Sequence, residues 1–128
     1  MYVGGWFTDA GGVPNTSRIA RWDGAQWHPL GGGLNSVVYA LAVSGGQVYV
    51  GGSFTDAGGN TNADYIARWD GAQWHPLGGG LNSVVYALAV SGSDVYVGGA
   101  FTDAGGNANA DYVARWDGSS WHPLGAGL

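Results

Sequence analysis

The chain has 128 residues and a formal net charge of −5, with nine Asp, four Arg and no Lys, Glu or Cys. This charge argues against nucleic acid and against an anionic membrane surface as partners, because both need a basic patch. The lack of Cys excludes disulfide and thiolate chemistry. No apolar run approaches the length of a membrane span, so we expect no membrane insertion.

A period of 47 residues runs through the whole chain. Residues 20–45 and 67–92 are identical, and Trp22, Trp69 and Trp116 are in register. A fixed period of this length indicates a repeat architecture. Such close copying indicates a designed protein or a recently amplified array, because drift would have scattered substitutions. Three periods exceed the chain length by 13 residues, so we expect three repeats that lack one short stretch.

The first repeat is expected to begin within its second strand, because Met1 aligns with Val48 and Val95. This alignment indicates a chain that was cut or designed. Glycine is abundant without a three-residue spacing, and Lys and Glu are missing, which together favour short strands and tight turns over helices. We expect eleven strands in all, four in each complete repeat. In the last copy the four runs are residues 84–90, 95–101, 112–117 and 121–124.

The first strand of a complete repeat has apolar residues on both faces, which predicts burial on two sides. In the second strand, the paired glycines Gly98 and Gly99 would let a neighbouring backbone or ring approach closely. If side chains alternate strictly along the first strand, one face carries Val84, Tyr86, Leu88 and Val90, and the other carries Val85, Ala87 and Ala89.

An Asp-Gly turn, such as Asp117-Gly118, predicts a hairpin between the third and fourth strands. The fourth strand contains Pro and is therefore placed at an edge. Two Trp in each repeat would then lie opposite one another, adding roughly 0.5–1.5 kcal/mol beyond area burial. The side chains that we predict to pack between repeats are Trp22, Trp27, Trp69, Trp74, Trp116, Trp121, Phe54, Phe101, Tyr86 and Leu88.

Four antiparallel strands in each repeat predict an all-β fold made of β-propeller blades. The first strand would line the axis and the fourth would form the rim. We divide the chain into residues 1–34, a blade without its first (inner) strand, and two complete blades at 35–81 and 82–128. A solenoid or a sandwich explains four short strands and one long loop per period less well.

The pattern VYALAVSGxDVYVGGxFTDAGG…ARWDGxxWHPLG resembles the kelch-like and WD-type propeller superfamily. It is most similar to blades of secreted bacterial propellers and of the fungal cortical polarity-marker family. Trp69-Asp70 ends its strand as the WD pattern requires, but the Gly-His pair before the first strand is absent, so the WD hydrogen-bond network is not carried over. The resemblance implies a non-enzymatic binding module or surface scaffold, located outside the cell or on its surface.

Three blades do not close a propeller, which typically needs at least four. If an open face measured ~400 Å², leaving it wet would forgo roughly 10 kcal/mol at about 25 cal/mol per Å². We therefore expect the chain to be a structural module completed by other copies of itself, in a ring or a filament, or by adjoining blades of a longer array. Trp6, which replaces Ser53 and Ala100, and Leu128 are candidate assembly contacts.

The loop between the second and third strands has oxygen ligands at alternate positions, as calcium loops do. The first copy has Val13, Asn15 and Ser17 instead, and ordinary turn chemistry explains the same residues. A plain loop is therefore the favoured interpretation, and calcium is the alternative. The candidate ligands are Asp56, Asn60, Asn62, Asp64, Asp103, Asn107, Asn109 and Asp111.

The remaining residue types bear on three further functions. His28, His75 and His122 would meet around a metal only between assembled rings, so a surface role is favoured and no cofactor is expected. Seven Trp and seven Tyr beside Asp, Asn and Gly suggest glycan binding as the alternative function. Catalysis is not expected, because identical repeats would give many equivalent weak sites rather than one asymmetric pocket.

Overall fold

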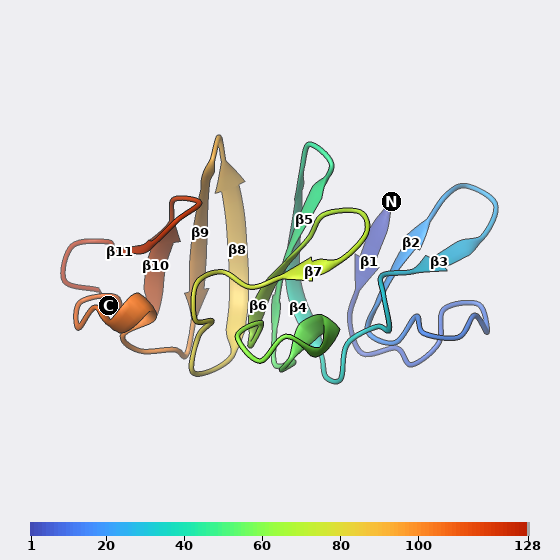
Figure 1. Ribbon diagram of the computed structural model, residues 1–128, viewed down its shortest axis with the longest axis horizontal. Coiled ribbons are helices and arrows are strands. Elements are labelled where there is room, and N and C mark those ends of the chain that lie inside the picture. The colour runs from blue at the N-terminus through green and yellow to red at the C-terminus, as the bar shows by residue number, and fades with distance from the viewer. Residues whose placement is uncertain (128) are drawn as a thin grey trace.

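The computed structural model describes residues 1–127, which form three antiparallel sheets in a row (Figure 1). The all-β prediction is confirmed, and eleven strands lie in the described residues. The N-terminal sheet contains β1 (Tyr2–Gly4), β2 (Ile19–Trp22) and β3 (Trp27–Pro29). The middle sheet contains β4 (Val38–Ser44), β5 (Gln47–Gly52), β6 (Ile66–Trp69) and β7 (Trp74–His75). The C-terminal sheet contains β8 (Val85–Ser91), β9 (Asp94–Gly99), β10 (Val113–Trp116) and β11 (Trp121–Pro123).

Within each sheet the strands follow one another in chain order, so every connection is local. The Pro-containing strands β3 and β11 are edge strands, as predicted. The loop between the second and third strands carries a single 3-10 turn, η1 (Ala57–Gly59) or η2 (Ala104–Gly106). Among the described residues, no helix is long and apolar enough to cross a membrane.

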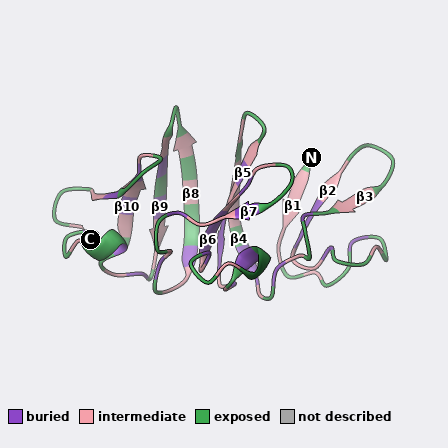
Figure 2. Cartoon of the chain, in the orientation of Figure 1, coloured by how far each residue is buried: buried purple, intermediate pink, exposed green. Residues whose placement is uncertain are grey.

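The hydrophobic cores lie between neighbouring sheets. In the first core, Ile19, Leu30 and Leu34 of the N-terminal unit pack with residues of the middle sheet such as Phe54 and Trp74. The second core repeats this arrangement one unit later, with Ile66, Leu77 and Leu81 packed on the C-terminal sheet. Burial is therefore concentrated where two sheets face each other (Figure 2).

Glycine on the second strand lets the next sheet come close. A Cβ on Gly51 would overlap the side chain of Val85 and lie 3.2 Å from Leu88 Cδ2. Gly4 stands in the same relation to Val38. The close approach predicted for Gly98 and Gly99 is confirmed at Gly99, where a Cβ would overlap the carbonyl oxygen of Val84, but not at Gly98. Gly98 is the equivalent residue in the C-terminal sheet, and only Tyr112 O, at 3.8 Å, would lie near its Cβ.

The prediction that the first strands are buried on both faces is wrong. Tyr39, Val43 and Tyr86 are exposed, and so are Ala87 and Ala89 on β8, whose outer side no further sheet covers. The middle of β8 is accordingly drawn as exposed (Figure 2).

The strict alternation predicted for residues 84–90 is also wrong. The pairing of β8 with β9 shifts between Val85 and Ala87, and β4 has the same irregularity between Val38 and Ala40. Such a β-bulge leaves one extra residue unpaired and re-aims the side chains around it. Val85 and Leu88 therefore both face Gly51, whereas Tyr86 is 56% exposed.

Replacing Gly51 by Ala is expected to destabilise the chain, because the new Cβ overlaps the Val85 side chain. We expect the free energy of unfolding to fall by about 1–3 kcal/mol, the usual cost of overpacking. Gly98→Ala is the matched control and should change it by less than about 0.5 kcal/mol, because that position is open. Urea unfolding of both variants checks the difference, and equal effects would contradict the proposed close approach.

Candidate functional site: the junction between sheets

Each hairpin between the third and fourth strands carries a Trp pair at its end. The registers place Trp22 opposite Trp27, Trp69 opposite Trp74 and Trp116 opposite Trp121, as predicted. The ring centroids are 5.0, 5.2 and 5.3 Å apart, with the planes tilted by 53–56°. The same rigid aromatic unit is therefore presented by all three sheets.

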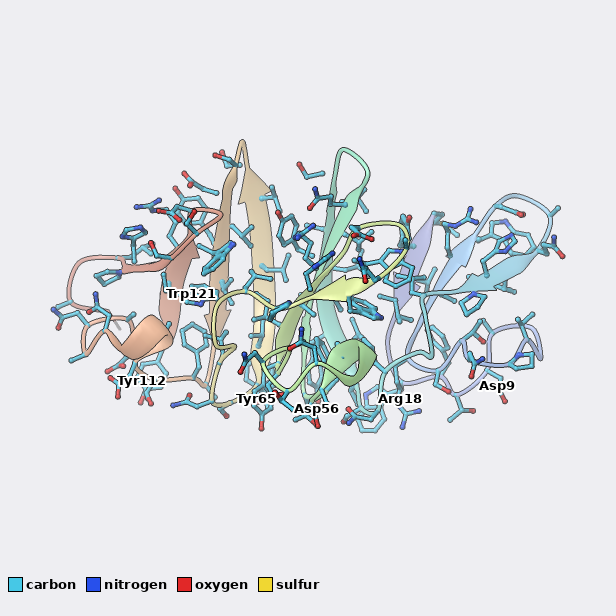
Figure 3. All side chains as sticks on the ribbon, viewed as in Figure 1. Asp9, Arg18, Asp56, Tyr65, Tyr112 and Trp121 are labelled. Atoms are coloured by element: carbon cyan, nitrogen blue, oxygen red, sulfur yellow. The ribbon has the colours of Figure 1, made fainter. Side chains whose placement is uncertain are left out.

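The second Trp of the pair reaches across to the preceding unit. Trp74 Nε1 donates a hydrogen bond to the carbonyl oxygen of Leu30, and Trp121 Nε1 donates to that of Leu77, both at 3.1 Å. Figure 3 labels Trp121 in the C-terminal sheet. A buried indole N–H needs an acceptor, and here the main chain of the neighbouring unit supplies it.

The residues after the fourth strand form the surface against which these indoles pack. Leu30 and Leu77 are each only 1% exposed. Gly31 and Gly78 follow them at positive φ, and Trp rings lie 3.2–3.5 Å from the Cβ positions of these glycines. A side chain at either glycine would be strained by the positive φ, and at Gly78 its Cβ would also lie only 3.2 Å from the Trp116 ring. The junction therefore depends on main-chain atoms that only glycine leaves accessible.

The two outermost faces of the structure carry different halves of this junction. On the C-terminal sheet, Leu124 is 39% exposed and Val113 is half-buried, although its equivalents Ile19 and Ile66 are fully buried. On the N-terminal sheet, the Trp22–Trp27 pair is half-buried. In the other two sheets the corresponding Trp side chains are 6–8% exposed: Trp69, Trp74, Trp116 and Trp121.

A polar cleft opens beside each junction. The cleft between the N-terminal and middle sheets has a volume of about 840 Å³, and that between the middle and C-terminal sheets about 450 Å³. The same nine repeat positions line both, and no Arg, Lys or His lines either. Asn35 bonds Thr55 across the first cleft, and Asn82 bonds Thr102 across the second. The nine positions of the second cleft are Gly79, Gly80, Leu81, Asn82, Thr102, Asp103, Ala104, Gly105 and Gly106.

The candidate calcium ligands hold their own loop together. Asp64 Oδ1 accepts the N–H of Asp56 at 2.8 Å, and Asn60 Oδ1 accepts the N–H of Asn62 at 3.0 Å. Asp111 with Asp103 and Asn107 with Asn109 repeat both bonds. Figure 3 labels Asp56 on this loop. Within residues 1–127, no three His or Asp side chains lie close enough together to hold a metal ion.

In the first copy, the Thr16 side chain takes the place of two backbone hydrogen bonds of this loop, those that join Ala63 to Ala57 and Asn60 in the second copy. Its side chain is fully buried, accepts the N–H of Ala10 at 2.7 Å and donates to the carbonyl of Val13 at 2.6 Å. The sequence analysis missed this role of Thr16, because the repeat alignment shows only that Val13 and Ser17 replace an Asn and an Asp of the other copies.

Each His pairs with the Asp of its own hairpin turn. His28, His75 and His122 lie 2.5, 2.6 and 2.7 Å from the Oδ2 of Asp23, Asp70 and Asp117. In each pair, the other carboxylate oxygen of the Asp accepts two backbone N–H groups of the turn. The sequence analysis missed this pairing, although the fixed spacing of Asp-Gly-x-x-Trp-His was its visible signal.

These contacts hold the pKa of all three carboxyl groups well below their ordinary value of 3.8. For Asp70 the hydrogen bond to His75 is the largest cause, followed by the backbone N–H groups of the turn. For Asp23 and Asp117 the backbone N–H of Gln26 or Ser120 is the largest cause.

Ser120 joins the last His–Asp pair but does not form a catalytic relay. Its Oγ lies 3.3 Å from His122 Nε2, the same nitrogen that contacts Asp117. A serine triad needs the carboxylate and the hydroxyl on different ring nitrogens. The cluster therefore provides turn geometry rather than an activated nucleophile.

The remaining predicted contact residues lie in different surroundings. Phe54 and Phe101 are fully buried, and Leu88 packs against the second core. Tyr86 lies outside the core, with its ring centroid 5.4 Å from that of Tyr39 on the neighbouring sheet. Trp6 is 71% exposed. The candidate contact Leu128 lies outside the described residues.

Comparison of the chain with protein-family models, with curated proteins and with solved structures found no match. The site is therefore interpreted from its own geometry.

Acid is expected to weaken the fold through the three turn carboxylates. Because their folded-state pKa is lowered, their contribution is present above the unfolded value of 3.8 and is lost as the pH falls below it. The unfolding free energy should therefore fall between about pH 5 and pH 2.5. In a triple Asp→Asn variant at positions 23, 70 and 117, this fall should be shallower. Urea unfolding at a series of pH values checks the slopes, and parallel curves would exclude these carboxylates as the cause.

Proposed function

We propose that the chain is a non-enzymatic structural module that assembles by stacking sheet on sheet, as blades of a β-propeller or of a longer array. One observation carries the proposal. The junction that joins the sheets inside the chain is built twice, and its two halves recur separately on the outermost faces, with Trp22 and Trp27 at one end and Leu124 at the other. The exposed halves favour continuation of the same stacking with other copies of the chain.

The arrangement of apolar residues supports this proposal. The two cores described above lie between sheets, so a sheet without a neighbour leaves apolar surface in water. The order of strands, with the Pro-containing strand at one edge of the sheet, agrees with the resemblance to propeller blades. A location outside the cell or on its surface belongs to the same proposal and rests on that resemblance alone.

The proposed assembly predicts particles larger than one chain. Sedimentation of the purified chain across a hundredfold concentration range should give a mass that is a multiple of its 13.1 kDa. Dilution should shift the distribution towards the single chain, because association follows mass action. A single folded chain at every concentration, with native circular dichroism, would contradict the proposal.

A second candidate function, glycan binding, is favoured by the repeated cleft. Nine repeat positions line it at both junctions, and their polar groups are amide, hydroxyl, carboxylate and glycine main chain. With no cationic side chain in the lining, the cleft suits a neutral polyhydroxylated ligand better than an anion. Two clefts that share these nine positions would add avidity for a branched or repeated glycan.

Glycan binding predicts two sites per chain for a neutral oligosaccharide, measured by titration calorimetry after a glycan-array screen. Asp56→Ala with Asp103→Ala should abolish binding, because these carboxylates line the two clefts. Asp9→Ala is the matched control and should leave binding unchanged, because Asp9 occupies the same repeat position but lines neither cleft. An array without any neutral glycan bound, or equal losses in both variants, would reject this function.

A further inference from the structure

We propose that copies of this chain join head to tail through one defined contact. In it, the Trp22–Trp27 pair of one copy sits over Leu124 and Gly125 of the next. The Trp27 indole N–H then donates to the Leu124 carbonyl oxygen. This inference rests on the proposed assembly function and names the surface, the direction and the hydrogen bond by which assembly proceeds.

The donor half is already formed on the N-terminal sheet. The Trp22–Trp27 rings have the same separation and tilt as the two pairs that form internal junctions. Trp27 is also supported from behind in the same way, because Gly11 lies against its Cδ1 as Gly58 lies against that of Trp74. No acceptor for the Trp27 N–H lies within residues 1–127, whereas Trp74 and Trp121 each have one.

The acceptor half is formed on the C-terminal sheet. The Leu124 carbonyl accepts the N–H of Gly127 at 3.1 Å, as Leu30 accepts that of Gly33 and Leu77 that of Gly80. At the two internal junctions, a Trp N–H is the second donor to the same oxygen. A carbonyl oxygen has two lone pairs, so Leu124 has one left for an indole.

The surface that would receive the indole rings of the other copy has the same backbone conformation as at the two internal junctions. Gly125 has φ 63°, and its equivalents Gly31 and Gly78 have φ 63° and 64°. Indole atoms lie 3.2–3.5 Å from the Cβ positions of Gly31 and Gly78, whereas no atom of residues 1–127 lies within 4 Å of that of Gly125. Val113 borders the same face, and its buried equivalents Ile19 and Ile66 belong to the two cores.

The contact has a direction, because the two faces are different. The indole face has a donor and the Leu124 face has an acceptor, so neither face complements itself. Two copies therefore meet through unlike surfaces, and each copy retains one free face. Such a heterologous contact continues into a ring or a filament rather than stopping at a symmetric dimer.

Two variants, each blocked on one face, test this contact by complementation. Trp27→Ser removes the donor face and Val113→Asp places a charge on the acceptor face. Each residue lies on the outer side of its sheet and is half-buried, so both variants are expected to fold, which circular dichroism checks. Val43→Asp is the control, because Val43 is 52% exposed on β4 and lies on neither face.

Each blocked variant alone should sediment as a single chain, and the Val43→Asp control should assemble as the original does. An equimolar mixture of the two blocked variants should give a particle of two chains, because one retains the donor face and the other the acceptor face. Trp27→Phe keeps an aromatic ring, although a smaller one, but removes the N–H, and should weaken association by at least about fivefold to tenfold, the fold-change of one hydrogen bond.

The outcomes separate this contact from the function on which it rests. If the original chain is always a single chain, both the assembly function and the contact fail. If the original assembles and the two folded variants also assemble, the assembly function stands and this contact is overturned. A mixture of folded variants that stays at one chain would also overturn it.

Discussion

Burial between sheets is the constraint on which the rest of the structure depends. Each sheet is small, and the fully buried large side chains, such as Phe54 and Phe101, lie in cores that two neighbouring units share. The indole-to-carbonyl bond then fixes how the sheets sit, because it joins a side chain of one unit to the main chain of the unit before it. Stability and specificity thus arise at the same place. Each face of a sheet in this protein therefore supplies one half of a junction.

The glycines serve that junction in two ways. On the second strand, Gly51 has no side chain where Val85 must pack, and after the fourth strand Gly31 combines positive φ with space for the rings. The high glycine content is therefore concentrated where one unit approaches another or where the chain reverses. It lowers the intrinsic stability of the strands, and the apolar burial between sheets offsets that cost.

Much of the fold could be predicted from the sequence, because its local signals are strong. The Asp-Gly turns placed each Trp pair across a hairpin, and the period of 47 residues gave the number of strands. The bulge beside Tyr86 could not be predicted, because neither Gly nor Pro marks it and the register of two strands decides it. The bond from Trp74 to Leu30 spans 44 residues and uses a main-chain acceptor, which leaves no side-chain pattern in the sequence. The Asn and Asp of the long loop suggested calcium because the same oxygens suit a metal and a tight turn.

All the groups that build a junction lie within one period, and this has a consequence for how such a protein changes in length. Insertion or deletion of one period by recombination recreates an indole beside a leucine carbonyl and a glycine, wherever in the period the break occurs. Copy number can therefore vary in whole steps without new complementary mutations. The identical residues 20–45 and 67–92 provide the homologous stretch that such exchange requires. In this architecture, an interface is inherited together with the unit rather than acquired after it.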